Sequence, residues 1–446
     1  MNELHEMTAC QLKALIRERK VGVEELTRHF LNRMERYDPL LNCVAERSHS
    51  AIRQARKLDS QRTGRDSLLF GLPFLVKDNI DAAGLHTTAG SMALTNNLAA
   101  DNAPVVENIL RSGGILLGKT NMTEFANFTS HTMPNGFSSR GGFVKNAYDR
   151  NKDPGGSSTG SAVAVSAGFC SMAVGTDTSF SIVACAAENG IAGFKPQTRS
   201  LSSKGILPLS KTLDSAGPLC KNLSDALLLY EGMLGKSLSP IQPTPPRELR
   251  IAVNTFHRED ISVNQRRRYE QLMENMRTDG TQFSEISQPC SPSQSIIMQC
   301  EFREGLESYL ASSSAKRKTL REIIAFYKAA PQERMPYGIS VLLEASQKST
   351  RDPAYRDAMA TRARLRAQAL QELAPFDACI MTGPTNIMHL TGLPSLALKL
   401  CTGEDNLPKG MILYGADQRR LLAAALTIES YCSPFSPPCL ENQEAL

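Results

Sequence analysis

Apolar and polar positions alternate along the first third of the chain in patterns that predict helices and buried strands. Residues 8–58 carry apolar side chains at three- and four-residue spacing, as in "LTRHFLNRMERY", which predicts helix. The apolar runs at 68–81 and 115–121 predict strands, and residues 103–114 between them predict a helix closed by glycines. Residues 125–156 are rich in Asn, Ser, Gly and Pro and are expected to form loops.

The middle and the end of the chain extend this alternation, with one interruption. Small residues at about 158–169 predict a buried helix leading into a strand. Residues 235–375 are polar and charged, with a Pro-rich start and long helical patterns. Beyond them, "FDACIMTGP" and "LPSLALKL" return to strand-like texture, and "QRRLLAAALTIESY" closes as a helix. The pattern therefore predicts a single α/β domain over 1–446, with a variable helical excursion at about 235–375.

Composition excludes several classes of protein. The 446 residues carry a net charge of only +5, with 41% hydrophobic and 21% charged residues, so a sizeable core is expected. The one short basic run, "QRRRYE" at 265–270, is typical of a solvated helix face, and no nucleic-acid partner is predicted. No run reaches the roughly 20 apolar residues that a membrane span needs, and 161–175 comes closest. We expect no membrane association.

The cysteines point to a protein of a reducing compartment, and the histidines give no sign of a metal site. The eleven cysteines are scattered and show no CxxC pair, which is typical of reduced thiols. The beginning, "MNELHEMTACQLKALIRERK", has the pattern of an amphipathic helix rather than of a secretory leader, so a cytoplasmic location is expected. The seven histidines are isolated, with no HExxH. No metal or organic cofactor is predicted.

Two short segments match the letters of known sequence motifs, a phosphate-binding loop and a nucleophile elbow. "GGILLGKT" at 113–120 satisfies the phosphate-loop pattern, but that mechanism needs a strand, a flexible loop and a helix in this order. Here a helix precedes, and Ile115–Leu117 favour a strand that ends at Lys119. "GSSTG" at 156–160 matches the nucleophile elbow of serine esterases and would make Ser158 the nucleophile.

The esterase interpretation lacks its context but remains an alternative. The elbow should follow a buried strand, whereas "DRNKDPGG" precedes it here. Asp214 could complete a triad with His257 or His389, although no local pattern around these residues supports it.

Three polar features interrupt otherwise apolar segments. Lys77 ends an apolar strand, where burying a charge is costly. "PGGSSTGSAVAVSAG" offers consecutive hydroxyls after a glycine pair, and "GTDTSFS" offers another serine after a glycine-led turn. Taken singly, each has an ordinary structural explanation: a lysine reaching solvent, a Gly/Ser linker, or hydroxyls that cap a helix.

Together these segments resemble one family. "GLPFLVKDNIDAAGLHTTAGS", "GGILLGKTNMTEFANF", "DPGGSSTGSAVAVSAG", "GTDTSFSIVACAAENGIAGFKP" and "GILPLSKTLDSAGPL" follow one another as in the amidase signature family. The resemblance is strongest to free-standing bacterial amidases related to the A component of glutamyl-tRNA amidotransferase, which share the "PNG-SSRGG" of residues 134–142. It implies one large α/β domain whose mixed central sheet is covered by helices on both faces.

The resemblance also implies a Ser–cis-Ser–Lys triad. Lys77 corresponds to the base, Ser157 to a bridging serine that follows a cis bond from Gly156, and Ser181 to the nucleophile. A serine needs a neighbouring base, and a lysine serves only when it is neutral. An exposed lysine has a pKa near ~10.4, and burial beside an apolar strand would lower it.

Further residues take their roles from the same resemblance. The family builds its oxyanion hole from the backbone N–H groups of the nucleophile turn, which here comprises Thr178, Ser179, Phe180 and Ser181. Four residues are carried over as substrate-binding: Asn127, Met133, Gly155 and Asp177.

This chain departs from the family at the nucleophile turn. Phe180 stands where members nearly always have Gly, and a left-handed conformation there would cost about 1–2 kcal/mol. Cys185 replaces a usual Pro, and Val183 an Arg common in the broader family. We therefore predict an amidase acting on a small-molecule amide, with activity weakened or a pocket narrowed by Phe180. A non-catalytic homologue or an amidotransferase-like subunit is the main alternative, and a homo-oligomer is compatible with either.

Overall fold

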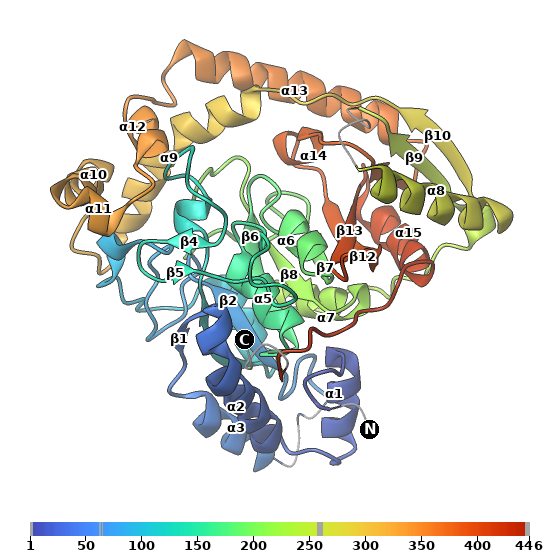
Figure 1. The fold of residues 1–446 in the computed structure, drawn as a ribbon, viewed down its shortest axis with the longest axis horizontal. Coiled ribbons are helices and arrows are strands. Elements are labelled where there is room, and N and C mark those ends of the chain that lie inside the picture. The colour runs from blue at the N-terminus through green and yellow to red at the C-terminus, as the bar shows by residue number, and fades with distance from the viewer. Residues whose placement is uncertain (1–2, 62–63, 65, 257–261, 442–446) are drawn as a thin grey trace.

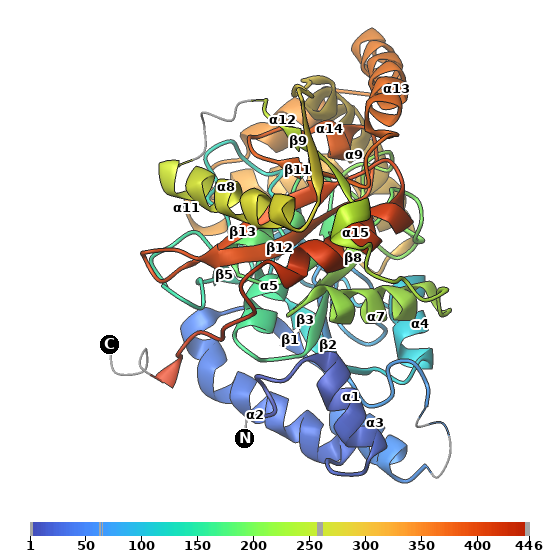
Figure 2. The ribbon, with the colours of Figure 1, turned by 90° about the vertical axis from the view of Figure 1, so that its right-hand side faces the viewer.

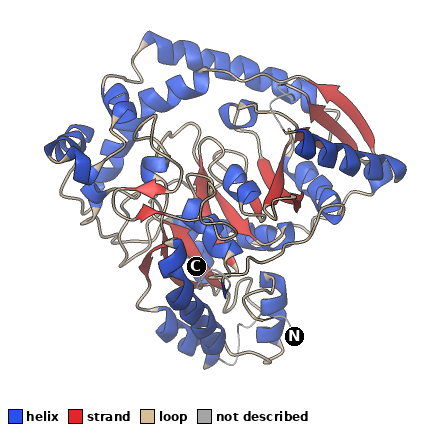
Figure 3. Cartoon of the chain, viewed as in Figure 1, coloured by secondary structure: helices blue, strands red, loops and turns tan. Residues whose placement is uncertain are grey.

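A large mixed β-sheet runs through the middle of the molecule and carries helices on both faces (Figure 3). The computed structural model describes residues 3–61, 64, 66–256 and 262–441. The sheet has eleven strands in the order β1-β3-β2-β6-β8-β7-β12-β13-β11-β9-β10. Its strands are β1 (Val44–Arg47), β2 (Pro73–Lys77), β3 (Ile115–Thr120), β6 (Met172–Asp177), β7 (Ala192–Lys195), β8 (Ser215–Cys220), β9 (Arg250–Asn254), β10 (Gln282–Ile286), β11 (Ala378–Met381), β12 (Ser395–Thr402) and β13 (Pro408–Tyr414). The predicted α/β class is confirmed.

Helices surround this sheet in groups that Figures 1 and 2 show from two sides. The N-terminal helices gather at one end, and the helices of the predicted excursion arch over the opposite end. The helices are α1 (Ala9–Arg17), α2 (Val23–Leu41), α3 (Ala51–Asp59), α4 (Pro104–Arg111), α5 (Thr159–Ser166), α6 (Val183–Glu188), α7 (Leu223–Leu234), α8 (Val263–Thr278), α9 (Ser293–Ser312), α10 (Leu320–Ala329), α11 (Pro331–Arg334), α12 (Ser340–Ser346), α13 (Pro353–Leu373), α14 (Ile387–Leu390) and α15 (Gln418–Ser430).

The strands at the centre of the sheet are buried along their whole length. Every residue of β2, β3 and β6 is buried, as expected for parallel strands covered on both faces. β2 pairs in parallel with both β3 and β6. Helix α5 consists of small residues and is likewise buried throughout, which lets it lie close to the sheet. This close packing brings the polar residues at the strand ends together.

The predicted helical excursion is only partly helical. β9 and β10 pair in parallel at the edge of the sheet, with α8 between them in sequence, so these three elements extend the core. Polar residues in β10, "QFSEI", hid the strand because an edge strand exposes much of its length. The remainder, α9 to α13, is helical as expected. A second omission is β1, which lies within the range predicted as helix and pairs with β3.

The phosphate-loop match is a strand, as the sequence predicted. β3 runs through Lys119, whose side chain is fully buried among backbone carbonyls and one hydroxyl. The three left-handed residues Phe125, Ala126 and Asn127 fall in the segment predicted as loop. Among the described residues no helix combines the length and apolarity that crossing a bilayer would require.

Candidate active site

Neighbouring strands and a close-packed helix carry the three predicted triad residues to one edge of the sheet. Lys77 is the last residue of β2, and β6 lies beside it in parallel with Val76 opposite Val174. The carboxyl ends of parallel strands meet at the same edge, so the turn after β6, which holds Ser181, reaches Lys77. Ser157 lies just before α5, which packs on these strands.

The three side chains form a continuous chain of contacts. Lys77 Nζ lies 2.8 Å from Ser157 Oγ, and Ser157 Oγ lies 3.0 Å from Ser181 Oγ. The bond between Gly156 and Ser157 is cis, as the resemblance implies. All three side chains are buried, with Ser181 retaining 6% exposure. A proton could therefore pass from one end of the chain to the other without crossing open solvent.

Lys77 is held in surroundings that disfavour its charge. Its side chain has no exposed surface, and burial lowers its pKa to about 8, although Cys185, Asp177 and Asp214 oppose the shift. Apart from Ser157, Nζ contacts Ser158 Oγ at 3.0 Å and Thr176 through Oγ1 at 2.9 Å and the carbonyl at 3.2 Å. Most of these partners are hydroxyls, which either donate or accept a hydrogen bond.

The turn between β6 and α6 leaves backbone donors unused beside Ser181. Among the described residues no acceptor contacts the N–H groups of Ser179, Phe180 or Ser181. Asp177 fixes the turn from below, since its Oδ2 accepts the N–H of Ile182 at 2.7 Å. Such a group of free donors beside a nucleophile is the usual form of an oxyanion hole.

Phe180 adopts the left-handed conformation that its position requires, with φ of 66°. Its ring packs on the ring of His389, at 4.2 Å between centroids. His389 Nδ1 in turn lies 3.0 Å from Asp177 Oδ1, and both side chains are buried. Burial acts to raise the pKa of Asp177, but His389, Lys195 and the N–H of Ile182 together outweigh it and lower that pKa. The buried pair of Asp177 and His389 therefore stabilises this turn, through the N–H of Ile182 and the ring of Phe180.

The geometry does not favour all four predicted substrate-binding residues. Asp177 is fully buried, and its carboxylate accepts the N–H of Ile182 and lies 3.0 Å from His389, so the structure shows it in contact with its own turn. Its contact with substrate stays a prediction. Gly155 is also buried, and a Cβ there would lie 3.1 Å from the Cα of Cys185. Asn127 is exposed, and Met133 is buried in an apolar cluster that also contains Phe128 and residues of α9 and α10. Their contact with substrate stays a prediction.

Ser158 does not have the partners of an esterase nucleophile. Its Oγ contacts Lys77 Nζ, and Thr176 through both its carbonyl and its N–H. The two candidate partners lie elsewhere: Asp214 accepts from Thr178 Oγ1 at 2.6 Å, and His389 pairs with Asp177. His257 lies outside the described residues. The esterase arrangement is absent from the part of the chain that can be described.

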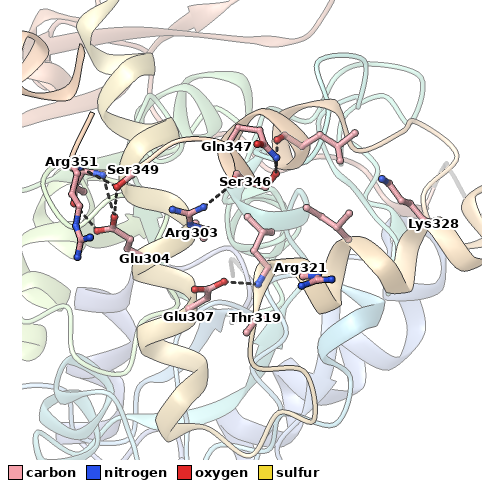
Figure 4. A pocket seen from close by; sticks show the side chains of 14 residues that line it. Arg303, Glu304, Glu307, Thr319, Arg321, Lys328, Ser346, Gln347, Ser349 and Arg351 are labelled. Atoms are coloured by element: carbon pink, nitrogen blue, oxygen red, sulfur yellow. Dashed lines mark hydrogen bonds between the residues drawn. The ribbon is translucent and has the colours of Figure 1, made fainter. Parts of the chain in front are cut away.

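One cavity lies near this edge of the sheet, and a second lies among the helices of the predicted excursion. One, of about 510 Å³, reaches Asp214 and Thr176, which is a hydrogen-bond partner of Lys77. The other, of about 970 Å³, lies between α9, α10 and α12 (Figure 4). Its charged side chains mainly brace its walls: Arg303 donates to the Ser346 carbonyl and Glu307 accepts from Leu320 N–H. Within the described residues no group of three metal-ligating side chains occurs.

Two residues at the site were not singled out from the sequence. Thr176 stands one residue before Asp177 and supplies two of the Lys77 contacts. Its hydroxyl was visible in "GTDTSFS" but could not be told from the others. Gln294 lies in α9, and its Nε2 donates to the Thr178 carbonyl at 3.0 Å. Nothing in the sequence around Gln294 marks it.

Fold and site together define an α/β protein in which a buried lysine and two serines meet at the end of parallel strands. The amidase family profile matches residues 25–386, and the chain belongs to this family. The resemblance seen in the sequence is therefore confirmed.

Individual relatives agree with this membership. A probable amidase of Arabidopsis thaliana is 35% identical over 237 residues, which cover 52% of this chain and 46% of that protein. The A component of the glutamyl-tRNA(Gln) amidotransferase of Coxiella burnetii is 38% identical over 234 residues, covering 52% and 47%. The chain thus spans about half the length of the curated relatives it matches.

A solved structure matches over nearly the whole length. The native peptide amidase of Stenotrophomonas maltophilia superposes with a TM-score of 0.89 at 29% identity, covering 98% of this chain and 99% of that one. The fold is therefore shared over nearly the whole of both chains.

Proposed function

We propose that this protein is an amidase that hydrolyses a carboxamide C–N bond through a serine acyl-enzyme. The observation that carries the proposal is the unbroken contact from Lys77 Nζ through Ser157 Oγ to Ser181 Oγ, at 2.8 and 3.0 Å. Membership of the amidase family and the likeness to a peptide amidase support the same reaction class.

In the first step, neutral Lys77 is the base for Ser181, and it acts through Ser157, which lies between them. Ser157 donates its hydroxyl proton to Nζ while it accepts the proton of Ser181. The Ser181 oxygen forms a bond to the carbonyl carbon, and the electron pair of the C=O bond moves to the oxygen. The backbone donors of Ser179, Phe180 and Ser181 face the negative charge that develops there.

In the second step, the proton returns by the same path. Lys77 passes its proton to Ser157, which protonates the leaving nitrogen as the C–N bond breaks and ammonia or an amine departs. Water then attacks the acyl-enzyme and loses its proton through Ser157 to Lys77. When the ester bond breaks, Ser181 takes the proton back and Lys77 is neutral again.

The proposal is tested by comparing Ser181→Ala with Ser158→Ala in an amide-hydrolysis assay and with a fluorophosphonate probe. Ser181→Ala should abolish labelling and lower kcat by about 10⁴-fold or more, because the nucleophile is gone. Ser158→Ala removes one Lys77 contact and should keep labelling at Ser181. Activity lost only in Ser158→Ala would transfer the assignment to the esterase alternative.

A weakened or non-catalytic homologue, such as an amidotransferase-like subunit, is the second candidate. Two observations favour it: the amidotransferase components among the relatives, and Phe180 in place of glycine with φ of 66°. Phe180→Gly separates the two. A large gain in rate over wild type would show that the turn limits activity, and an unlabelled wild-type protein would support the non-catalytic role.

A further inference from the structure

The nucleophile turn, residues 178–181, is held by a side chain of α9, which belongs to the predicted helical excursion. Gln294 is the second residue of α9 and is 3% exposed. Its Nε2 donates to the carbonyl oxygen of Thr178 at 3.0 Å. The carbonyl of Thr178 and the N–H of Ser179 belong to one planar peptide unit and point in opposite directions. Holding the carbonyl on one side therefore fixes where the N–H points on the other.

The same hydrogen bond strengthens the donor that it orients. Accepting a hydrogen bond polarises a peptide unit, which makes its N–H a better donor in low dielectric surroundings. The N–H of Ser179 has no acceptor among the described residues, so its polarity is available to a ligand. An aligned and polarised N–H is what a developing oxyanion requires.

Helix α9 is itself fixed to the core, so Gln294 is a firm support. About two turns further along, the buried Glu301 accepts hydrogen bonds from Ser210 and Thr212, both at 2.5 Å. The N–H of Ser210 is also bound by Asp214, whose carboxylate accepts the Thr178 hydroxyl at 2.6 Å. Thr178 is thus held through its carbonyl from α9 and through its side chain from the loop that α9 anchors.

We propose that Gln294 is a positioning residue that sets the oxyanion donors of the nucleophile turn. It acts through the Thr178–Ser179 peptide and does not touch the substrate. The proposal rests on the proposed amidase function and assigns to α9, in the predicted helical excursion, a role in the rate of the reaction.

The test replaces Gln294 by Met, which keeps the length of the side chain and removes the donor. The matched control is Gln299→Met on the same helix, since Gln299 bonds Glu344 near the surface, away from the turn. We expect Gln294→Met to lower kcat by about 10- to 100-fold with KM within about twofold of the control, because the donors act mainly in the transition state. Its second-order rate of fluorophosphonate labelling should fall by a similar factor.

The labelling rate constant does not depend on how much protein is folded, so partial unfolding cannot imitate this result. Gln294→Glu gives a second readout that a purely structural role would not produce. A protonated carboxyl donates to the Thr178 carbonyl and a carboxylate repels it. Because this position is 3% exposed, burial is expected to raise the pKa of the introduced carboxyl into the assay range, so the rate relative to wild type should fall about tenfold as pH rises from about 6 to 9.

Three outcomes would overturn the proposal: a kcat and labelling rate of Gln294→Met within twofold of Gln299→Met, a loss confined to KM, or a Gln294→Glu rate within twofold of wild type throughout pH 6 to 9. A wild-type protein that neither hydrolyses amides nor reacts with the probe would instead refute the proposed function, and the two failures are distinguishable for that reason.

Discussion

Strands β2 and β3 lie side by side in parallel, and each carries a fully buried lysine near its carboxyl end. Val76 pairs with Lys119 and Lys77 with Thr120, so the two lysines lie one register step apart. Burial lowers the pKa of both to about 8. By strand, burial and pKa the two are nearly equivalent.

Their hydrogen-bond partners differ in kind. Lys77 meets the hydroxyls of Ser157, Ser158 and Thr176 and one carbonyl. Lys119 meets the carbonyls of Ile80 at 2.5 Å and His86 at 3.0 Å, and a single hydroxyl. It also lies 3.9 Å from a carboxylate oxygen of Asp78.

A carbonyl only accepts, so an amine among carbonyls must keep its N–H groups to satisfy them. A hydroxyl can reverse direction, so an amine among hydroxyls can give up a proton and accept one back. Lys195 and Lys221 have surroundings similar to those of Lys119. Each is buried, has a pKa lowered to about 8, and donates to two backbone carbonyls. The comparison teaches that a lowered pKa alone does not identify a lysine as a catalytic base. Hydrogen-bond partners that can both donate and accept, such as hydroxyls, do identify it.

Replacing each lysine by Met should give opposite results, and this is the largest effect we expect. Lys77→Met should lower kcat/KM by about 10³-fold or more because the base is lost. Its free energy of unfolding should change by only about 1 kcal/mol, since the freed hydroxyls can pair with one another. Steady-state kinetics and urea unfolding measure the two effects. Full activity in Lys77→Met at every pH would refute the lysine-base mechanism.

Lys119→Met should act on stability instead. Two backbone carbonyls and one hydroxyl lose the ammonium group that they contact, and Asp78 loses a nearby positive charge, which should lower the free energy of unfolding by about 3 kcal/mol. The folded fraction should keep kcat within about threefold of wild type. Urea unfolding with activity measured per labelled site checks both, and a stable but inactive Lys119→Met would erase the distinction between the two strands.

The pH dependence of activity should report Lys77. The neutral amine is the active form, so kcat/KM should rise about tenfold per pH unit below pH 8 and level off above it. Because the pKa of Lys77 in the folded protein lies below its unfolded value near ~10.4, the unfolded state binds more protons between these values. Stability should therefore rise with pH over this window, and by less in Lys77→Met. A flat kcat/KM profile from pH 6 to 9 would contradict the assignment.

The smallest effect separates the hydroxyl partners of the two lysines. Thr176→Val removes an acceptor of charged Lys77 and should move the midpoint of the pH profile down by about half a unit to one unit. Thr87→Val removes the one hydroxyl of Lys119 and should leave the midpoint unchanged while costing about 1 kcal/mol of stability. Equal shifts in the two variants would show that the midpoint belongs to another group.

Most of the α/β core and the proximity of Lys77, Ser157 and Ser181 were predictable from the sequence, for identifiable reasons. Apolar runs such as those of β2, β3 and β6 are buried on both faces, and their periodicity and length are local properties. The strands β1, β9 and β10 were missed. β1 and β10 are short and expose polar side chains, so they lose the apolar signal, and β9 is a short apolar run inside a polar region. The contacts of Asp177 with Ile182 and His389 could not be predicted, because a carboxylate in a motif does not reveal which side chains and backbone groups surround it.

The sequence by itself determined which segments form the core and, through ordered motifs, that Lys77, Ser157 and Ser181 belong together. Only the tertiary structure decided which of several buried lysines has hydroxyl partners, that Phe180 packs on His389, and that Gln294 reaches the nucleophile turn from a distant part of the chain. The physical reason is that burial follows from local composition, whereas the identity of a hydrogen-bond partner depends on side chains that come together only when distant segments pack.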